Sequence, residues 1–121
     1  RNTGLQSILE ATISIESRKV FKPSPKTYSL IEQVLGVGPD ETLFVSSNGF
    51  DVAGAKAFGL NVAWIERVTA QALAKEFSGP VSAGPLTMFK ALRMRNEHLG
   101  LGPDHRVGSL SDIPRIVTAA D

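Results

Sequence analysis

The chain has 121 residues, a formal net charge of +1, 42% hydrophobic and 21% charged residues, the size and composition of one soluble globular domain. A net charge this close to zero gives no reason to expect nucleic acid or an acidic membrane as a partner. No apolar run approaches the ~18 residues of a membrane span. With no cysteine, disulfides and thiolate metal sites are excluded, and a cytoplasmic protein is expected.

The first part of the chain carries weak signals. Apolar residues spaced three and four apart predict a short amphipathic helix over residues 5–12, and the alternation at residues 13–15 predicts a brief strand. Pro23 disfavours the helical conformation at the residue before it. Lys22 is therefore expected on an extended loop.

A helix is predicted directly after this loop. Ser24 is expected at the N-cap of this helix, and Pro25 suits the first helical position. An apolar face that includes Tyr28 continues to Leu35, where Gly36 is typical of a helix end.

The centre of the chain predicts a strand, a polar loop, a helix and a second strand. These cover residues 42–45, 46–51, 52–58 and Asn61–Ile65. Two strands joined by one helix form a parallel pair with a right-handed crossover, so the predicted fold class is α/β with a Rossmann-like parallel sheet. Ligands of open α/β sheets bind at the carboxyl ends of the strands, which is where the polar loop lies.

The remaining chain predicts further helices and one more strand. Helices are expected over residues 69–77 and from residue 86 to about residue 99, a strand over residues 106–108, and a closing helix through Val117 that Ser111 caps.

The polar loop concentrates groups that could carry chemistry: Ser46, Ser47, Asn48, Phe50 and Asp51. Each also has a plain structural explanation. Asp51 could cap its helix, the serines and Asn48 could satisfy backbone groups, and Phe50 could belong to the core. Lys22 could be a surface lysine, or it could fix a nearby carboxylate at the carboxyl edge of the sheet. Tyr28 could be a core residue whose hydroxyl finds a local partner, or its hydroxyl could reach the same pocket as Lys22.

Several other kinds of site are not indicated. The sequence has neither a phosphate-binding P-loop nor a dinucleotide-binding glycine fingerprint. Its two histidines, His98 and His105, lie far from the loop serines, which disfavours a hydrolase triad. The loop offers Asp51 as its single carboxylate, so no metal site is predicted.

Two blocks of sequence together resemble one enzyme family. Lys22-Pro23 with Tyr28 six residues later, and the run FVSSNGFD at residues 44–51, resemble the L-2-haloacid dehalogenases of the haloacid dehalogenase superfamily. The similarity continues through residues 54–67 and returns at residues 103–110. The resemblance implies that residues 1–121 are the C-terminal part of a haloacid dehalogenase-like core, without the strand that carries the nucleophile and without the helical cap domain.

The resemblance also implies a reaction. In this family an aspartate displaces halide from the alpha carbon of a 2-haloalkanoate, and water then hydrolyses the ester to a 2-hydroxy acid. No aspartate here has the nucleophile's sequence context, so the nucleophile is expected in an N-terminal half of the same enzyme. The strand at residues 42–45 would border that missing strand, and the chain alone is expected to be inactive and to aggregate.

The family's roles transfer to matching positions in this chain. The residues given a catalytic role are Lys22, Ser46, Asn48 and Asp51; those given a substrate-binding role are Tyr28, Ser47 and Phe50. Lys22 would orient the nucleophile, Asp51 would activate water within a network that includes Ser46 and Asn48, and Phe50 would face the leaving halide. No metal or other cofactor is implied, and a homodimer is expected.

Two other interpretations remain open. The first is a magnesium-dependent phosphatase of the same superfamily, although Ser46 stands where those enzymes carry a metal-binding aspartate. The second is a non-catalytic α/β module that serves binding or assembly.

Overall fold

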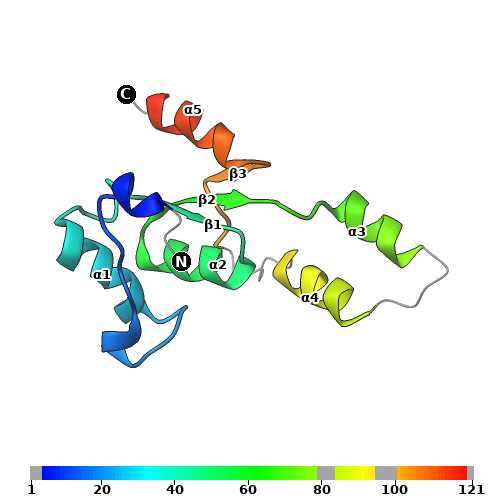
Figure 1. Ribbon diagram of the computed structural model, residues 1–121, viewed down its shortest axis with the longest axis horizontal. Coiled ribbons are helices and arrows are strands. Elements are labelled where there is room, and N and C mark those ends of the chain that lie inside the picture. The colour runs from blue at the N-terminus through cyan, green and yellow to red at the C-terminus, as the bar shows by residue number, and fades with distance from the viewer. Residues whose placement is uncertain (1–3, 79–83, 95–100, 120–121) are drawn as a thin grey trace.

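The computed structural model describes residues 4–78, 84–94 and 101–119, and it places a three-stranded parallel sheet at the centre of the molecule (Figure 1). The strands are β1 (Leu43–Ser46), β2 (Asn61–Ile65) and β3 (His105–Val107), in the spatial order β1-β2-β3. Both pairs of neighbouring strands are parallel. The predicted α/β class and parallel sheet are therefore confirmed.

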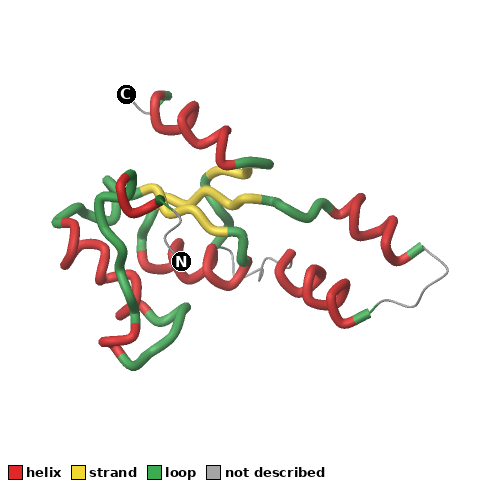
Figure 2. Tube along the Cα trace, viewed as in Figure 1, coloured by secondary structure: helices red, strands yellow, loops and turns green. Residues whose placement is uncertain are grey.

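Figure 2 shows the helices distributed around these strands. Their bounds are η1 (Leu5–Ser7), η2 (Glu16–Arg18), α1 (Pro25–Leu35), α2 (Gly49–Phe58), α3 (Ala70–Phe77), α4 (Pro85–Met94), η3 (Leu110–Asp112) and α5 (Ile113–Thr118). Helix α2 lies below the sheet and α5 above it in the view of Figure 1. Helices α1 to α4 match predicted helices, although α2 begins three residues earlier than expected. The predicted continuation of α4 falls on residues 95–100, outside the described residues.

The predictions for the first fifteen residues are wrong. One 3-10 turn, η1, replaces the expected helix over residues 5–12, and residues 13–15 form no strand. Ile8, on the predicted apolar face, is 77% exposed. A helix this short is marginal in water unless its apolar face packs on another element. Among the described residues no element covers that face, since Leu5, Ile8 and Leu9 are exposed, and no α-helix forms there.

Ser24 is the N-cap of α1, as predicted, although its side chain makes no capping bond and its carbonyl accepts from the Thr27 amide at 2.9 Å. The second capping prediction is wrong. At the C-terminal end, Ser109 rather than Ser111 is the cap: its hydroxyl accepts from the Ser111 amide at 3.2 Å while the Asp112 carboxylate accepts from the Ser109 amide at 3.0 Å. This reciprocal pair begins η3, so the closing helix α5 begins later, at Ile113.

The core lies between the sheet and helices α1 and α2. Its buried members are Tyr28, Val52, Ala55, Leu60, Val62 and Trp64. The Tyr28 ring meets the Phe44 ring edge to face at a centroid distance of 5.6 Å. Burying each large apolar side chain contributes about 1.5–3 kcal/mol, so this cluster fixes α1 and α2 against the sheet and with them the loops that they carry.

Helices α3 and α4 extend away from the sheet as a hairpin (Figure 1). Phe77, Leu86 and Leu92 on this hairpin are largely exposed. No helix among the described residues is long and apolar enough to cross a membrane.

A carboxylate on the loop before β3 links the strands to α2. Asp104 accepts hydrogen bonds from the Lys56 ammonium at 2.6 Å and from the Val62 amide at 2.8 Å, while its own amide donates to the Val62 carbonyl at 2.9 Å. Burial alone would raise the pKa of Asp104, but these hydrogen bonds and the charge of Lys56 outweigh burial and hold its pKa below the ordinary value of 3.8.

Asp104→Asn is therefore expected to destabilise the full-length protein by about 1.5–3 kcal/mol at neutral pH, the range for hydrogen bonds to charged groups. A depressed carboxyl pKa stabilises the fold above the ordinary pKa, and this contribution is lost as the pH falls through the folded-state pKa. The difference in Tm between wild type and variant should accordingly shrink below about pH 4. Glu10→Gln, at an exposed position, serves as the control, and an Asp104 effect that did not change with pH would contradict this account.

Candidate active site

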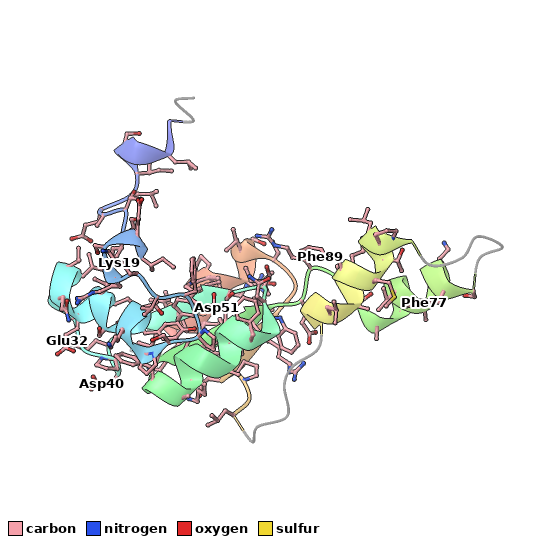
Figure 3. The ribbon with its side chains drawn as sticks, turned by 90° about the horizontal axis from the view of Figure 1, so that it is seen from below. Lys19, Glu32, Asp40, Asp51, Phe77 and Phe89 are labelled. Carbon is pink, nitrogen blue, oxygen red and sulfur yellow. The ribbon has the colours of Figure 1, made fainter. Side chains whose placement is uncertain are left out.

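Asp51 lies in the first turn of α2, immediately beyond the carboxyl end of β1, and is only 4% exposed. Its carboxylate does not cap its own helix, because the cap position belongs to Asn48 and no side-chain capping bond is present there. The interpretation of Asp51 as a helix cap is therefore wrong. Figure 3 shows Asp51 near the middle of the molecule.

Three side chains from three different elements donate to the Asp51 carboxylate. The Lys22 ammonium and the Ser46 hydroxyl each lie 3.0 Å from Oδ2, and the Tyr28 hydroxyl lies 2.8 Å from Oδ1. A buried carboxylate is costly unless it is paired and hydrogen-bonded. Here one cation and two hydroxyls supply both requirements, so the carboxylate is held in one orientation.

Lys22 is fixed by two contacts at once. Its side chain is 35% exposed, and its ammonium lies 3.0 Å from Asp51 and 4.9 Å from the centroid of the Phe44 ring. A cation over an aromatic face is attracted by the ring quadrupole. Phe44 therefore belongs to the site, although the sequence indicated only a strand residue. The sequence feature that could have identified Phe44 as a site residue is its two-residue spacing from Ser46, because this spacing places both side chains on one face of β1.

Tyr28 is a core residue whose hydroxyl reaches the same carboxylate that Lys22 contacts. Its ring is 1% exposed within the core, and its hydroxyl reaches Asp51. Burial raises the pKa of Tyr28 well above its ordinary value, and the hydrogen bond to Asp51 and the charge of Asp51 raise it further. The hydroxyl is thus protonated at neutral pH and acts as a donor.

The other predicted site residues surround this network. The Ser46 hydroxyl accepts a hydrogen bond from the backbone amide of Asn48 at 3.3 Å, which shapes the loop. Phe50 is 46% exposed, so its interpretation as a core residue is wrong. Ser47 lines a cavity of about 220 Å³ between the end of β2 and α4, whose walls include Trp64 and Phe89. The structure therefore brings Lys22, Tyr28, Ser46 and Asp51 together, with Asn48, Ser47 and Phe50 around them.

This arrangement suits general-base chemistry better than metal binding. Within the described ranges, no group of three or more His, Asp or Glu side chains gathers. A carboxylate held in one orientation beside a cation can act as a general base toward a water molecule that reaches it.

The chain resembles known proteins along nearly its whole length. Residues 1–59 match a family model of haloacid dehalogenase-like hydrolases. An (S)-2-haloacid dehalogenase of Xanthobacter autotrophicus is 55% identical over 117 residues, which are 96% of this chain and 46% of the relative. (S)-2-haloacid dehalogenase 2 of a Pseudomonas strain is 32% identical over 119 residues, which are 98% of this chain and 42% of the relative.

Solved structures agree with these matches. The L-2-haloacid dehalogenase of Xanthobacter autotrophicus superposes with a TM-score of 0.90 at 52% identity, covering 99% of this chain and 49% of that chain. The structure of that enzyme with chloropropionic acid covalently bound gives a TM-score of 0.89 at 53% identity, with the same coverage. The present chain thus spans about half the length of the relatives that it matches.

Proposed function

Because this chain belongs to the haloacid dehalogenase superfamily, where its relatives are L-2-haloacid dehalogenases, we propose that the protein hydrolyses L-2-haloalkanoic acids to 2-hydroxy acids. The fold predicted from the resemblance, a haloacid dehalogenase-like core, is confirmed. The observation that carries the proposal is the buried Asp51 carboxylate, which Lys22, Tyr28 and Ser46 hold at the carboxyl end of β1.

The first proposed step forms an ester. A carboxylate oxygen of an aspartate in an N-terminal part of the enzyme, outside this chain, bonds to the alpha carbon of the substrate, and the halide leaves with the electrons of the carbon–halogen bond. Lys22 would orient this nucleophile, because its ammonium is already held at the strand end by Asp51 and Phe44. In the described part of the chain β1 pairs with β2 alone, which leaves its other edge available for the strand that carries the nucleophile.

The second proposed step hydrolyses that ester. Asp51 accepts a proton from a water molecule while the water oxygen adds to the ester carbonyl. The bond between that carbonyl carbon and the ester oxygen then breaks, the departing oxygen takes the proton from Asp51 to become the 2-hydroxy group, and the nucleophile is left as a carboxylic acid that loses its proton to solvent. The hydroxyls of Ser46 and Tyr28 hold the two oxygens of Asp51 in place during this transfer. Asn48, whose backbone amide donates to the Ser46 hydroxyl, belongs to the same water-positioning network.

The remaining site residues would contact the substrate. Phe50 is exposed beside Asp51, so its ring edge is available to the departing halide. Tyr28 and Ser47 would lie near the substrate carboxylate. The residue types also favour a reaction without a metal, because Ser46 ends the strand in place of an acid and Lys22 supplies the positive charge beside Asp51. We further propose that residues 1–121 are the C-terminal part of the core domain of a cytoplasmic homodimer.

The test is halide release from (S)-2-chloropropionate by the full-length protein with a metal chelator present. Release should continue with the chelator, and the (R) enantiomer should react far more slowly. Absence of halide release, or its loss on chelation, would overturn the proposal. Magnesium-dependent phosphate release would support a superfamily phosphatase, and inactivity with all these substrates would support a non-catalytic module.

A further inference from the structure

Gly54 occupies an unexpected place for a glycine. It lies in the interior of α2, three residues after Asp51 and therefore on the same helix face. Glycine inside a helix costs about 1 kcal/mol relative to alanine. The residue must have a compensating reason, and its surroundings provide one.

A methyl group has no room at this position. A Cβ added to Gly54 would lie 2.4 Å from the Pro23 Cβ, 2.6 Å from the Tyr28 hydroxyl and 3.2 Å from the Pro23 Cα. Contacts between non-bonded carbon atoms are favourable only at about 3.5–4.0 Å. The neighbouring atoms would therefore have to retreat by about 1 Å.

These neighbours belong to the two segments that hold Asp51. Pro23 follows Lys22 directly, and Lys22 donates to Oδ2, while Tyr28 donates to Oδ1. We propose that Gly54 is a positioning residue, whose missing side chain lets the Lys22-Pro23 loop and the Tyr28 hydroxyl approach α2 closely enough for both to bind Asp51. The effect of Gly54 on the reaction rate rests on the proposed function. Its effect on the hydrogen bonds to Asp51 does not.

Neither neighbour can yield without disturbing the network. Tyr28 is packed in the core between the rings of Phe44 and Phe58, and the contact with Pro23 includes its Cα, so movement there displaces the backbone next to Lys22. If α2 moved instead, it would carry Asp51 with it. A hydrogen bond lengthened by about 1 Å is no longer a hydrogen bond, so at least one donor to Asp51 is lost in either case.

The test compares Gly54→Ala with Gly108→Ala in the full-length protein. A Cβ at Gly108 meets nothing within 4 Å, which makes it a matched control. Misplacing a catalytic group by 1 Å can cost about 10²-fold in rate. Gly54→Ala should therefore lower kcat for halide release by about 10- to 100-fold with KM little changed, while Gly108→Ala should leave both unchanged.

A second measurement does not depend on activity. The ionisation of Tyr28 can be followed by ultraviolet titration, by subtracting the absorbance curve of the Tyr28→Phe variant from that of the protein that retains Tyr28. Because burial and Asp51 together raise the Tyr28 pKa, a hydroxyl pushed away from Asp51 should ionise at lower pH in Gly54→Ala. In the Tyr28→Phe background, which lacks the hydroxyl that clashes, adding Gly54→Ala should cost less activity than it does in the wild type.

The outcomes separate this inference from the proposed function. If the wild type releases no halide, the proposed function fails and the titration still decides the inference. A Tyr28 titration in Gly54→Ala that matches the wild type overturns it. If Gly54→Ala does not fold, its effect is measured as the difference in Tm between the triple variant, which adds Tyr28→Phe and Pro23→Gly, and the double variant Tyr28→Phe/Pro23→Gly. A small difference supports the inference, because both clashing side-chain atoms are gone, and unfolding of the triple variant alone overturns it.

Discussion

Asp51→Asn lowers steady-state halide release from (S)-2-chloropropionate by the full-length protein about 10³-fold, within the range for loss of a general base. The asparagine side chain has nearly the same shape, so the loop can keep its path, but the amide cannot accept the proton of the attacking water. Both kcat and KM should fall while kcat/KM changes little, because Asp51 is proposed to act after the ester has formed, so the ester accumulates.

Asp40→Asn is the control for this substitution, since Asp40 is an exposed acid at the turn before β1. It should retain the wild-type rate. A rate for Asp51→Asn within tenfold of the wild type would contradict the role of Asp51 as the base that activates water.

Lys22→Met lowers halide release by about 10²- to 10³-fold, comparable to the loss of one preorganised electrostatic donor in other enzymes. Methionine keeps the length and much of the volume of lysine but removes the charge. It therefore leaves the buried Asp51 without its cation and the incoming nucleophile without its orienting partner. Halide release itself should slow, because Lys22 is proposed to act in the first step.

Lys22→Arg should not restore the wild-type rate. The ammonium is a compact point charge at 3.0 Å from Asp51, over the Phe44 ring, and a planar guanidinium is not equivalent to it. Lys26→Met changes an exposed lysine in the first turn of α1 and should have no effect. Full activity in Lys22→Met would show that the ion pair with Asp51 has no part in the reaction.

The sequence allowed the central βαβ unit to be predicted because its signals are local. Short apolar runs indicated β1 and β2, and glycine indicated the ends of α1 and α2. The same reasoning failed at residues 5–12, because a short amphipathic pattern forms a helix only where another element covers its apolar face. In that case the deciding information lies in the tertiary structure.

The candidate site depends on contacts between distant residues. Lys22 and Tyr28 meet Asp51 across 29 and 23 residues of sequence. Local pattern explained Asp51 equally well as a helix cap, and the resemblance to the L-2-haloacid dehalogenases singled out Lys22 and Tyr28 as its partners in one site. Phe44 and Gly54 were missed as site residues, because a ring beneath an ammonium and the absence of a Cβ matter only once the chain has folded.

We propose that this chain supplies the groups that hydrolyse an ester formed on a nucleophile elsewhere in the protein. Intact-protein mass spectrometry after a single turnover with (S)-2-chloropropionate can detect that ester. Asp51→Asn should release halide once and retain the substrate's propionate moiety as a stable ester, whereas Lys22→Met should accumulate little ester. An Asp51→Asn protein that turns over like the wild type, or that neither releases halide nor gains the propionate moiety, would contradict the claim.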